Sequence, residues 1–438
     1  FFYPQTPLFP YLYGIWCKFA GFTWESARAL SAIFSILIGI ILFKFLKSKS
    51  SKIIASILFL VFTFSGMNIA WLVTIKPYGT SAFLILILYI LMEKKITRPL
   101  QIVFIGFIIG LLFNIRSYLV VIGLIPSFLI FLSKEQFSTK LKQFLLLAFG
   151  AFLTLLPHIY WILKDFDVYY FNNIGFHLMR SEDSSAELAQ GKLNVLYYLL
   201  GINSNIKFEG FQFSILVWSW IICFLQSVLK KKLPSLAWFF CLLIFIISFV
   251  PSPAWLQYFS VALPLLIICF YELIKEWPAT IKLSSCIALL LYTTYTGSID
   301  FNSYTNTGEG VHGIYETNLE ASRIKNIDQI SKKIDEYVSP GDKVVSVWPG
   351  YLFESHAEIY PGMENQFWIR VENQLNDDQA KRYRVMTLRA LQEVVRKQQV
   401  KLLIIDLHKA GRFFPRKILQ KSGYKEIAKL HNVLFYVH

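Results

Sequence analysis

The chain has 438 residues, of which 55% are hydrophobic, 17% aromatic and only 16% charged, and its mean hydropathy is +0.49. This composition is too apolar for a water-soluble protein of that length and indicates a polytopic α-helical membrane protein. The net charge of +15 would suggest nucleic-acid binding in a soluble chain, but here Lys and Arg fall mainly in short loops between apolar runs. We therefore expect no nucleic-acid partner.

The first 27 residues form an aromatic and proline-rich stretch that leads directly into an apolar segment over 28–46. The sequence starts at Phe1 rather than at Met, and it starts in the middle of a pattern. We interpret residues 1–27 as the end of an outer loop and expect an upstream segment that this sequence does not contain.

About ten apolar runs approach the ~20 residues that a helix needs to cross the hydrocarbon core. Several are shorter, which is tolerated where helices are broken or packed inside protein. The runs cover approximately residues 28–46, 53–73, 79–92, 100–114, 118–132, 142–163, 211–229, 236–250, 257–273 and 281–297.

Alternate loops between these runs are basic, as cytoplasmic loops are by the positive-inside rule. The basic side chains are Lys44, Lys47, Lys49, Lys52, Lys94, Lys95, Arg98, Lys134, Lys140, Lys142, Lys230, Lys231, Lys232, Lys275 and Lys282. The other loops, Phe1 and everything after Gly297 are then expected outside. An outside N-terminus implies an odd number of preceding spans, so we expect about eleven spans or more in the whole protein.

Two outside segments are too long to be simple connectors. The first, at about 164–210, is rich in aromatic, acidic and amide side chains. The second, over 298–438, is polar and alternates expected helices (321–338, 386–398 and RKILQKSGY) with expected strands (KVVSVW, KLLIIDL, KEIAKL and NVLFYVH). This alternation predicts a soluble α/β domain after a transmembrane domain over 28–297. Neither GxGxxG nor GxxxxGK[ST] occurs in it, so nothing in the sequence supports a nucleotide site there.

The stretch YPQTPLFPYLYGIWCKFAGFTWESARALSAIFSIL resembles the segment that closes the first outer loop in membrane glycosyltransferases of the GT-C class. That class contains the protein mannosyltransferases and the lipid A aminoarabinose transferase. The matching positions are Pro7, Leu8, Tyr11, Leu12, Gly21, Arg28 and Ser31. The run WLQYFSVALPLLIICFYELI is similar to a late helix of the class that starts near a Tyr and carries a Pro, here Tyr258 and Pro264. The tail from GDKVVSVW is similar to C-terminal domains of bacterial members.

The resemblance implies inverting transfer of a sugar from a polyprenyl-phosphate donor. Such a reaction needs a carboxylate to take the acceptor proton and cations to stabilise the departing phosphate. In the family the carboxylate comes from early in the first outer loop, a position that would lie upstream of Phe1. The family also often has an Asp just before the helix that starts here near Gly79, but this chain has no acid between Lys76 and Phe83.

Several residues of the chain are candidates for the site. Arg116 lies between apolar runs, and a cation so close to hydrocarbon normally faces a cavity or the protein interior, where it can bind phosphate or form a structural ion pair. Asp165 and Asp167, after the outer end of a run, are weaker candidates for a catalytic acid or metal ligand, and a solvated pair at a helix end is the alternative. Further candidates for binding substrate or lipid phosphate are Arg28, Lys76, His177, Arg180 and Tyr258.

Other features carry no assigned chemistry. His158 follows a proline within an apolar run and is interpreted as a packed core histidine. The five cysteines lack CxxC or metal-ligand spacing and are interpreted as small buried residues, so no metal site is assigned. No cofactor is assigned either, and a divalent metal ion is left open.

We expect a hexosyl- or pentosyltransferase in a bacterial inner membrane, with its active site and C-terminal domain on the extracytoplasmic side. Its expected partners are a lipid-linked sugar donor, membrane lipids and a glycan, lipid or protein acceptor. The alternatives are another envelope-glycan membrane protein, such as an O-antigen polymerase or ligase, and a transporter or flippase of lipid-linked sugars. A flippase would predict internal repeats, and the sequence shows none.

Overall fold

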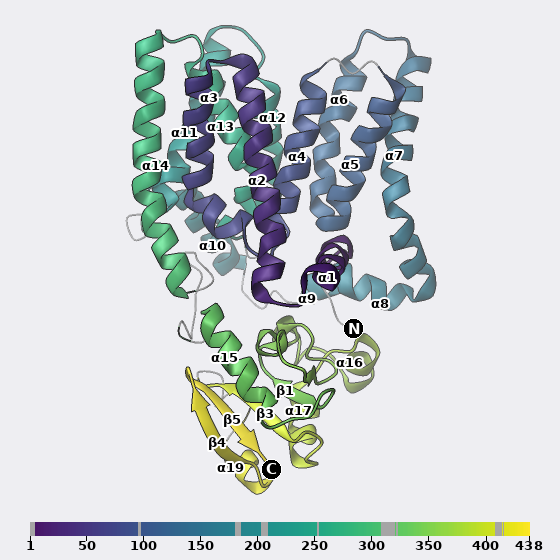
Figure 1. Ribbon diagram of the computed structural model, residues 1–438. Helices are drawn as coiled ribbons and strands as arrows, with labels where there is room; N and C mark the ends of the chain where they lie inside the picture. The colour runs from purple at the N-terminus through teal and green to yellow at the C-terminus, as the bar shows by residue number, and fades with distance from the viewer. Residues whose placement is uncertain are drawn as a thin grey trace.

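The computed structural model describes residues 5–94, 98–179, 185–202, 209–251, 254–307, 320, 323–407, 414 and 416–438. A bundle of long helices stands on a smaller unit of strands and short helices (Figure 1). The bundle helices are α2 (Trp24–Lys49), α3 (Lys52–Phe64), α4 (Tyr78–Glu93), α5 (Pro99–Ile115), α6 (Leu124–Leu132), α7 (Phe137–Lys164), α11 (Glu209–Leu229), α12 (Leu236–Phe249), α13 (Leu263–Ile274) and α14 (Ala279–Thr307). Every predicted apolar run lies on one of these helices or on a helical turn joined to it.

Helix lengths differ across the bundle. Among the described residues, three helical stretches are long and apolar enough to cross a membrane, namely Trp24–Lys49, Phe137–Lys164 and Leu256–Ile274. The other apolar helices are 10–17 residues long, and several continue into a tighter or wider turn. Such turns are tolerated at membrane depth where surrounding protein satisfies the backbone. The sequence-based count of about ten spans therefore stays a prediction.

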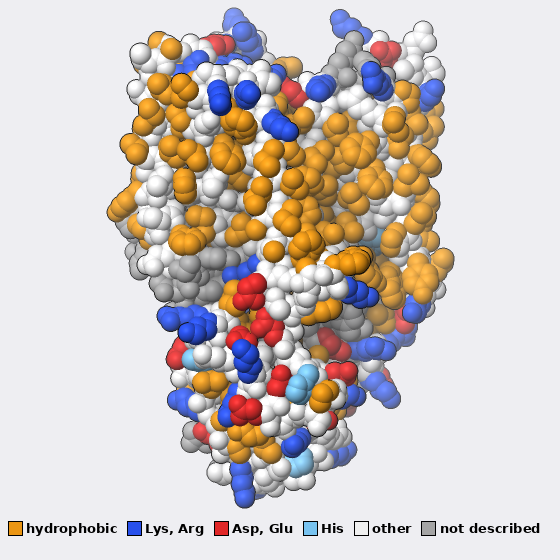
Figure 2. All heavy atoms as spheres, in the orientation of Figure 1, with side chains coloured by type: hydrophobic (Ala, Val, Ile, Leu, Met, Phe, Trp, Pro, Cys, Tyr) orange, Lys and Arg blue, Asp and Glu red, His pale blue; other side chains and the backbone are white. Residues whose placement is uncertain are grey.

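Basic side chains gather at one end of the bundle. In Figure 2 the charged side chains above the apolar band are mostly Lys and Arg, whereas acidic and basic side chains are mixed at the opposite end. We call these ends the basic end and the α/β end. The turns at the basic end are the loops that the sequence predicts to be cytoplasmic.

Helices α5 and α7 pack with their backbones almost in contact. A Cβ at Gly106 would lie 2.0 Å from the carbonyl oxygen of Leu147, and one at Gly150 would lie 2.0 Å from that of Val103. A Cβ at Gly110 would lie 2.0 Å from Thr154 Oγ1. Glycine is therefore required at all three positions, and the close approach fixes the end of α5 against α7.

Short helices cover the α/β end of the bundle (Figure 1). They are α1 (Leu8–Ala20), α8 (Phe166–Tyr170), the π-helical turn η3 (Phe171–Gly175), α9 (Phe176–Met179) and α10 (Ser185–Leu199). Helix α1 is tied to the bundle by a short polar chain, because the Tyr13 hydroxyl donates to Ser31 Oγ at 2.6 Å and Ser31 donates to the Thr74 carbonyl at 2.7 Å. The predicted long loop at 164–210 is thus largely helical where it is described.

The smaller unit has a mixed five-stranded sheet in the order β2-β1-β3-β5-β4. Strand β1 runs parallel to β2 and β3, whereas β5 runs antiparallel to β3 and β4. Its elements are α15 (Ile324–Asp335), β1 (Lys343–Ser346), η5 (Pro349–Leu352), β2 (Glu358–Ile359), η6 (Gln366–Arg370), α16 (Asp377–Tyr383), α17 (Leu388–Arg396), β3 (Leu402–Asp406), α19 (Arg416–Lys421), β4 (Lys425–Leu430) and β5 (Val433–Val437).

These elements include the helices and strands that the sequence predicts after residue 298. The very short strand β2 and helix α16 were not predicted, because neither has an apolar run of its own. Helix α14 extends to Thr307, beyond residue 298 where the composition changes. The domain limits at 27, 297 and 298 stay predictions.

The α/β unit contacts the bundle at two places. At the first, the backbone N–H of Trp24 donates to Glu354 Oε1 at 2.7 Å, and the Trp24 ring stacks on Trp348 with a centroid distance of 5.9 Å. Burial raises the pKa of the Glu354 carboxyl. At the second, Phe171 and Phe176 are buried in the apolar core of the α/β unit. The segment after α7 therefore belongs structurally to both parts.

Candidate functional site

The segment between α3 and α4 carries the side chains of Trp71 and Lys76. It includes the π-helical turn η1 (Asn68–Leu72). A hydrogen bond from Ser35 Oγ of α2 to Asn68 Oδ1, at 2.7 Å, fixes this turn against α2. Helix α4 then starts directly against this turn, since a Cβ at Gly79 would lie 2.4 Å from the Leu72 carbonyl oxygen. The short loop between the apolar runs at 53–73 and 79–92 is thus pressed onto the bundle.

Arg116 stands where α5 ends. Its backbone is extended (φ −153°, ψ 113°), and its N–H still bonds to the Leu112 carbonyl at 2.9 Å. The 3₁₀ turn η2 (Ser117–Gly123) follows and connects to α6. This change of backbone direction points the Arg116 side chain at the start of α4 and at the 3₁₀ turn η4 (Leu256–Ala262), as its contacts show.

Three tyrosines surround the Arg116 guanidinium, and we call the four residues the arginine cage. Nη1 donates to the Tyr118 hydroxyl at 2.5 Å, and Nη2 donates to the Tyr78 hydroxyl at 3.1 Å. The guanidinium carbon lies 4.5 Å from the ring centroid of Tyr78, 5.6 Å from that of Tyr118 and 5.1 Å from that of Tyr258. These are cation–π distances, so the aromatic faces stabilise the charge without neutralising it.

The cage leaves the cation able to bind an anion. A guanidinium has five N–H donors, and the hydroxyls of Tyr118 and Tyr78 take two of them. Among the ion pairs of the described residues, none includes Arg116. A partly buried cation with spare donors and no carboxylate partner in the described chain is a suitable site for a phosphate.

A second cation adjoins the cage. Lys76 Nζ lies 4.7 Å above the Trp71 ring, and Trp71 meets Tyr78 edge-on with a centroid distance of 6.0 Å. Lys76 also immediately precedes Pro77, the cap of α4, so it lies at the positive end of that helix dipole. The predicted candidates Arg116, Lys76 and Tyr258 are thus brought together.

The remaining basic candidates lie on other elements. Arg28 is partly buried near the start of α2, and His177 is partly buried on α9 with its ring 5.3 Å from that of Phe176. Arg180 lies outside the described residues.

The two acidic candidates lie at the second contact with the α/β unit. Asp165 Oδ1 accepts from the Val168 N–H at 3.1 Å and caps α8, and Arg382 of α16 bonds to Asp165 at 3.4 Å and to Asp167 at 2.7 Å. The cap, and then Arg382, lower the pKa of the Asp165 carboxyl. Beside them Phe171 stacks on Tyr383 at 4.0 Å. Both carboxylates are therefore engaged in holding the α/β unit.

No group of three or more His, Cys, Asp or Glu side chains that could hold a metal ion occurs in the part of the chain that the structure describes. The cysteines, which the sequence predicts to be buried, are all buried and free.

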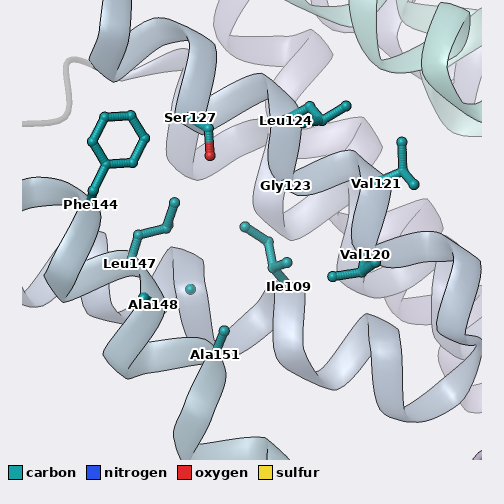
Figure 3. Close-up of a pocket in the computed structure, with 11 residues that line it drawn as sticks. Ile109, Val120, Val121, Gly123, Leu124, Ser127, Phe144, Leu147, Ala148 and Ala151 are labelled. Carbon is teal, nitrogen blue, oxygen red and sulfur yellow. The ribbon is translucent and has the colours of Figure 1, made fainter.

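An apolar cavity of about 450 Å³ lies between α5, η2, α6 and α7. Figure 3 shows its lining side chains, which are almost entirely hydrocarbon, with Ser127 as a polar exception. Its lining includes Val120, Val121 and Gly123 of η2, the turn that also contains Tyr118 of the arginine cage. The arginine cage and the cavity are thus joined by a single turn of chain.

Sequence reasoning missed Trp71, Tyr118 and the hydrogen-bond partners of His158. Tyr118 had a usable signal, because it lies two residues after Arg116 in an otherwise apolar stretch. His158 is buried, as the sequence predicts for a packed core histidine, and its ring nitrogens bond to Asn114 at 2.6 Å and to Tyr169 at 2.8 Å. A contact such as that between His158 and Asn114, which are 44 residues apart in the sequence, leaves no local pattern.

Comparison with known proteins matches part of the chain to one family model and shows a known fold. Residues 4–161 match the family model of dolichyl-phosphate-mannose-protein mannosyltransferase. This stretch includes Arg116, Tyr78, Tyr118 and Lys76. No curated protein matches the chain in a sequence search.

Two solved structures with a similar fold are those of ArnT from Cupriavidus metallidurans, in the apo state and bound to undecaprenyl phosphate. Each is 10% identical to this chain, with a TM-score of 0.68, and the match covers 99% of this chain and 88% of ArnT. At this identity the likeness shows the fold. The chain therefore shares the fold of a protein that has been solved with undecaprenyl phosphate.

Proposed function

We propose that this chain, whose family match and fold confirm its resemblance to the GT-C class of membrane glycosyltransferases, transfers a sugar from a polyprenyl-phosphate donor to an acceptor at the outer face of the membrane. The observation that carries the proposal is the arginine cage. It presents a cation with spare N–H donors, no carboxylate partner in the described chain and a second cation, Lys76, nearby.

In the proposed reaction the cage holds the phosphate that leaves. Cleavage of the bond between the sugar and the phosphate oxygen puts negative charge on that phosphate, and Arg116 and Lys76 stabilise it most when the charge is fully developed. The tyrosines keep Arg116 in one orientation, so little reorganisation is needed during the reaction. A carboxylate must take the proton of the acceptor hydroxyl as that hydroxyl attacks the sugar.

The apolar cavity suits the lipid part of such a donor. A phosphate at Arg116 lies beside η2, and the same turn contributes Val120, Val121 and Gly123 to the cavity lining. An isoprenoid chain has no polar groups to satisfy, so a nearly pure hydrocarbon lining is a favourable environment for it. We propose that the first isoprene units lie along η2 toward this cavity.

The charge distribution supports the proposed orientation. The cage lies at the start of α4 and the end of α5, opposite the basic turn that joins these two helices and that the positive-inside rule assigns to the cytoplasm. The ArnT complex with undecaprenyl phosphate supports a polyprenyl phosphate as the carrier. A bacterial inner membrane, and an acceptor that is a lipid, glycan or protein, are parts of the same proposal.

A transfer assay with a matched arginine control tests the proposal. Membranes containing the protein are incubated with labelled polyprenyl-phosphate hexoses and pentoses, and transfer to endogenous acceptors is measured. We expect transfer from one of these donors and a loss of about 100-fold in Arg116→Ala, because a preorganised donor to the leaving group is removed. Arg389→Ala, which changes an exposed arginine on α17, should retain activity. Unchanged transfer by Arg116→Ala would contradict the proposal.

A further inference from the structure

Asn114, two residues before Arg116, fixes the last turn of α5 on α7. Its Nδ2 donates to the Gly110 carbonyl at 2.8 Å and to the Thr154 carbonyl at 2.8 Å. The side chain is 4% exposed, so these two bonds are not exchanged for water. Because both partners are carbonyl oxygens, the orientation of the Asn114 amide is determined, and only its Oδ1 remains to face His158.

This orientation also determines the state of His158. Nε2 lies 2.6 Å from Asn114 Oδ1, which can only accept, so Nε2 carries a proton. In the neutral imidazole Nδ1 is then an acceptor, and the Tyr169 hydroxyl donates a hydrogen bond to it at 2.8 Å. Tyr169, His158 and Asn114 thus form a directed chain of hydrogen bonds from α8 through α7 to the end of α5.

The far end of this chain lies on the segment that holds the α/β unit. Tyr169 belongs to α8, whose cap Asp165 bonds to Arg382. Phe171, two residues after Tyr169, stacks on Tyr383 of α16, and the planes of the two rings are nearly parallel. The position of α8, and with it the Tyr169 hydroxyl, therefore depends on how the α/β unit is docked.

We infer that Tyr169, His158 and Asn114 are positioning residues that couple docking of the α/β unit to the orientation of Arg116 in the arginine cage. When α8 is docked, the chain of hydrogen bonds holds the end of α5 at the angle from which Arg116 meets its tyrosines. When α8 shifts, His158 loses a partner, the last turn of α5 loosens and the lipid phosphate binds more weakly. By reciprocity, a bound lipid phosphate strengthens docking.

This inference rests on the proposed function, because it takes the lipid phosphate as the ligand of Arg116. The probe is farnesyl phosphate, whose dissociation constant is measured on the full chain in detergent. Arg116→Ala tests the proposed function alone. If this variant leaves the dissociation constant unchanged, Arg116 does not bind the phosphate and the proposed function fails. If it weakens binding while the variants below do not, the phosphate site stands and the inferred coupling fails.

Single substitutions separate the bonds of the chain. Tyr169→Phe removes one hydroxyl, and His158→Gln keeps an N–H for Asn114 Oδ1 but cannot reach Tyr169. We expect both to weaken farnesyl phosphate binding about three- to tenfold, and His158→Phe to weaken it further, with the thermal unfolding midpoint of Tyr169→Phe unchanged. Tyr160→Phe, on the exposed face of α7, is the matched control and should bind normally.

A double-mutant cycle decides whether the residues act as one coupled unit. Arg382→Ala weakens the contact of α8 with α16 and should weaken farnesyl phosphate binding in the natural chain. In the Tyr169→Phe background it should have little further effect, because the link to Arg116 is already broken. Equal effects of Arg382→Ala in both backgrounds, or normal binding by Tyr169→Phe, would overturn the inference.

Discussion

At the scale of residues, the site depends on how one cation is stabilised near hydrocarbon. Arg116 donates hydrogen bonds to two tyrosine hydroxyls and makes cation–π contacts with three tyrosine rings. An ion pair, by contrast, would have neutralised its charge. Tyr78 and Tyr118 each provide a hydroxyl and a ring, but Tyr258 contributes through its ring face. The three tyrosines therefore differ in what their substitution removes.

This difference leads to a prediction for Tyr258. Tyr258→Phe keeps the ring, so farnesyl phosphate binding should change little, whereas Tyr258→Leu removes a cation–π contact of about 0.5–2 kcal/mol and should weaken binding several-fold. Titration of both purified variants against farnesyl phosphate measures the contrast. Equal weakening by both substitutions would show that the Tyr258 hydroxyl, rather than its ring, contacts the phosphate.

At the scale of elements, the site depends on short helices that end at particular residues. The bond from Asn114 to the Thr154 carbonyl holds the last turn of α5 on α7. The two backbones approach so closely because Gly106, Gly110 and Gly150 lie in the contact. Helix α4 likewise starts at its position because Gly79 admits the Leu72 carbonyl. Packing of glycines, more than apolar area, sets these positions in a bilayer.

Replacing one of these glycines should therefore be costly. In Gly110→Ala the new methyl group would lie 2.0 Å from Thr154 Oγ1 and 2.6 Å from the Ala151 carbonyl oxygen, so α5 and α7 must separate. We expect destabilisation by about 1–3 kcal/mol, seen as a lower thermal unfolding midpoint in detergent. Gly14→Ala on α1, where a Cβ meets nothing within 4 Å, is the control and should be neutral or slightly stabilising.

If Gly110→Ala unfolded at the same temperature as the natural chain, the close approach of α5 and α7 would be wrong. The positions of Asn114 and Arg116 would then lose their structural basis.

At the scale of the whole molecule, composition and apolar runs predicted more than residue patterns did. Apolar runs predicted where the bundle helices lie, because burial in a bilayer or bundle requires long uninterrupted hydrocarbon. Alternation of helix and strand likewise predicted most of the α/β unit. The candidate site could be predicted only in part: Arg116 was conspicuous as a charge in an apolar stretch and Tyr118 lies two residues after it, but Trp71 was inconspicuous as one aromatic residue in an aromatic-rich chain.

The proposed orientation predicts which face of the membrane each end of the bundle reaches. The native cysteines are buried, so single exposed cysteines can be introduced with little background labelling. Ser339→Cys, in the α/β unit, should react with a membrane-impermeant maleimide in intact cells. Ser48→Cys, at the basic end, should react only after permeabilisation. The reverse labelling pattern would contradict an outer active site.

The central claim is that the arginine cage binds the phosphate of a polyprenyl-phosphate donor, and locating that phosphate tests it most directly. A density map of the full chain with bound undecaprenyl phosphate should place a phosphate oxygen about 3 Å from an Arg116 nitrogen. The lipid chain should run along η2. A phosphate bound instead at the basic end, for example beside Lys49 and Lys275, would contradict the account.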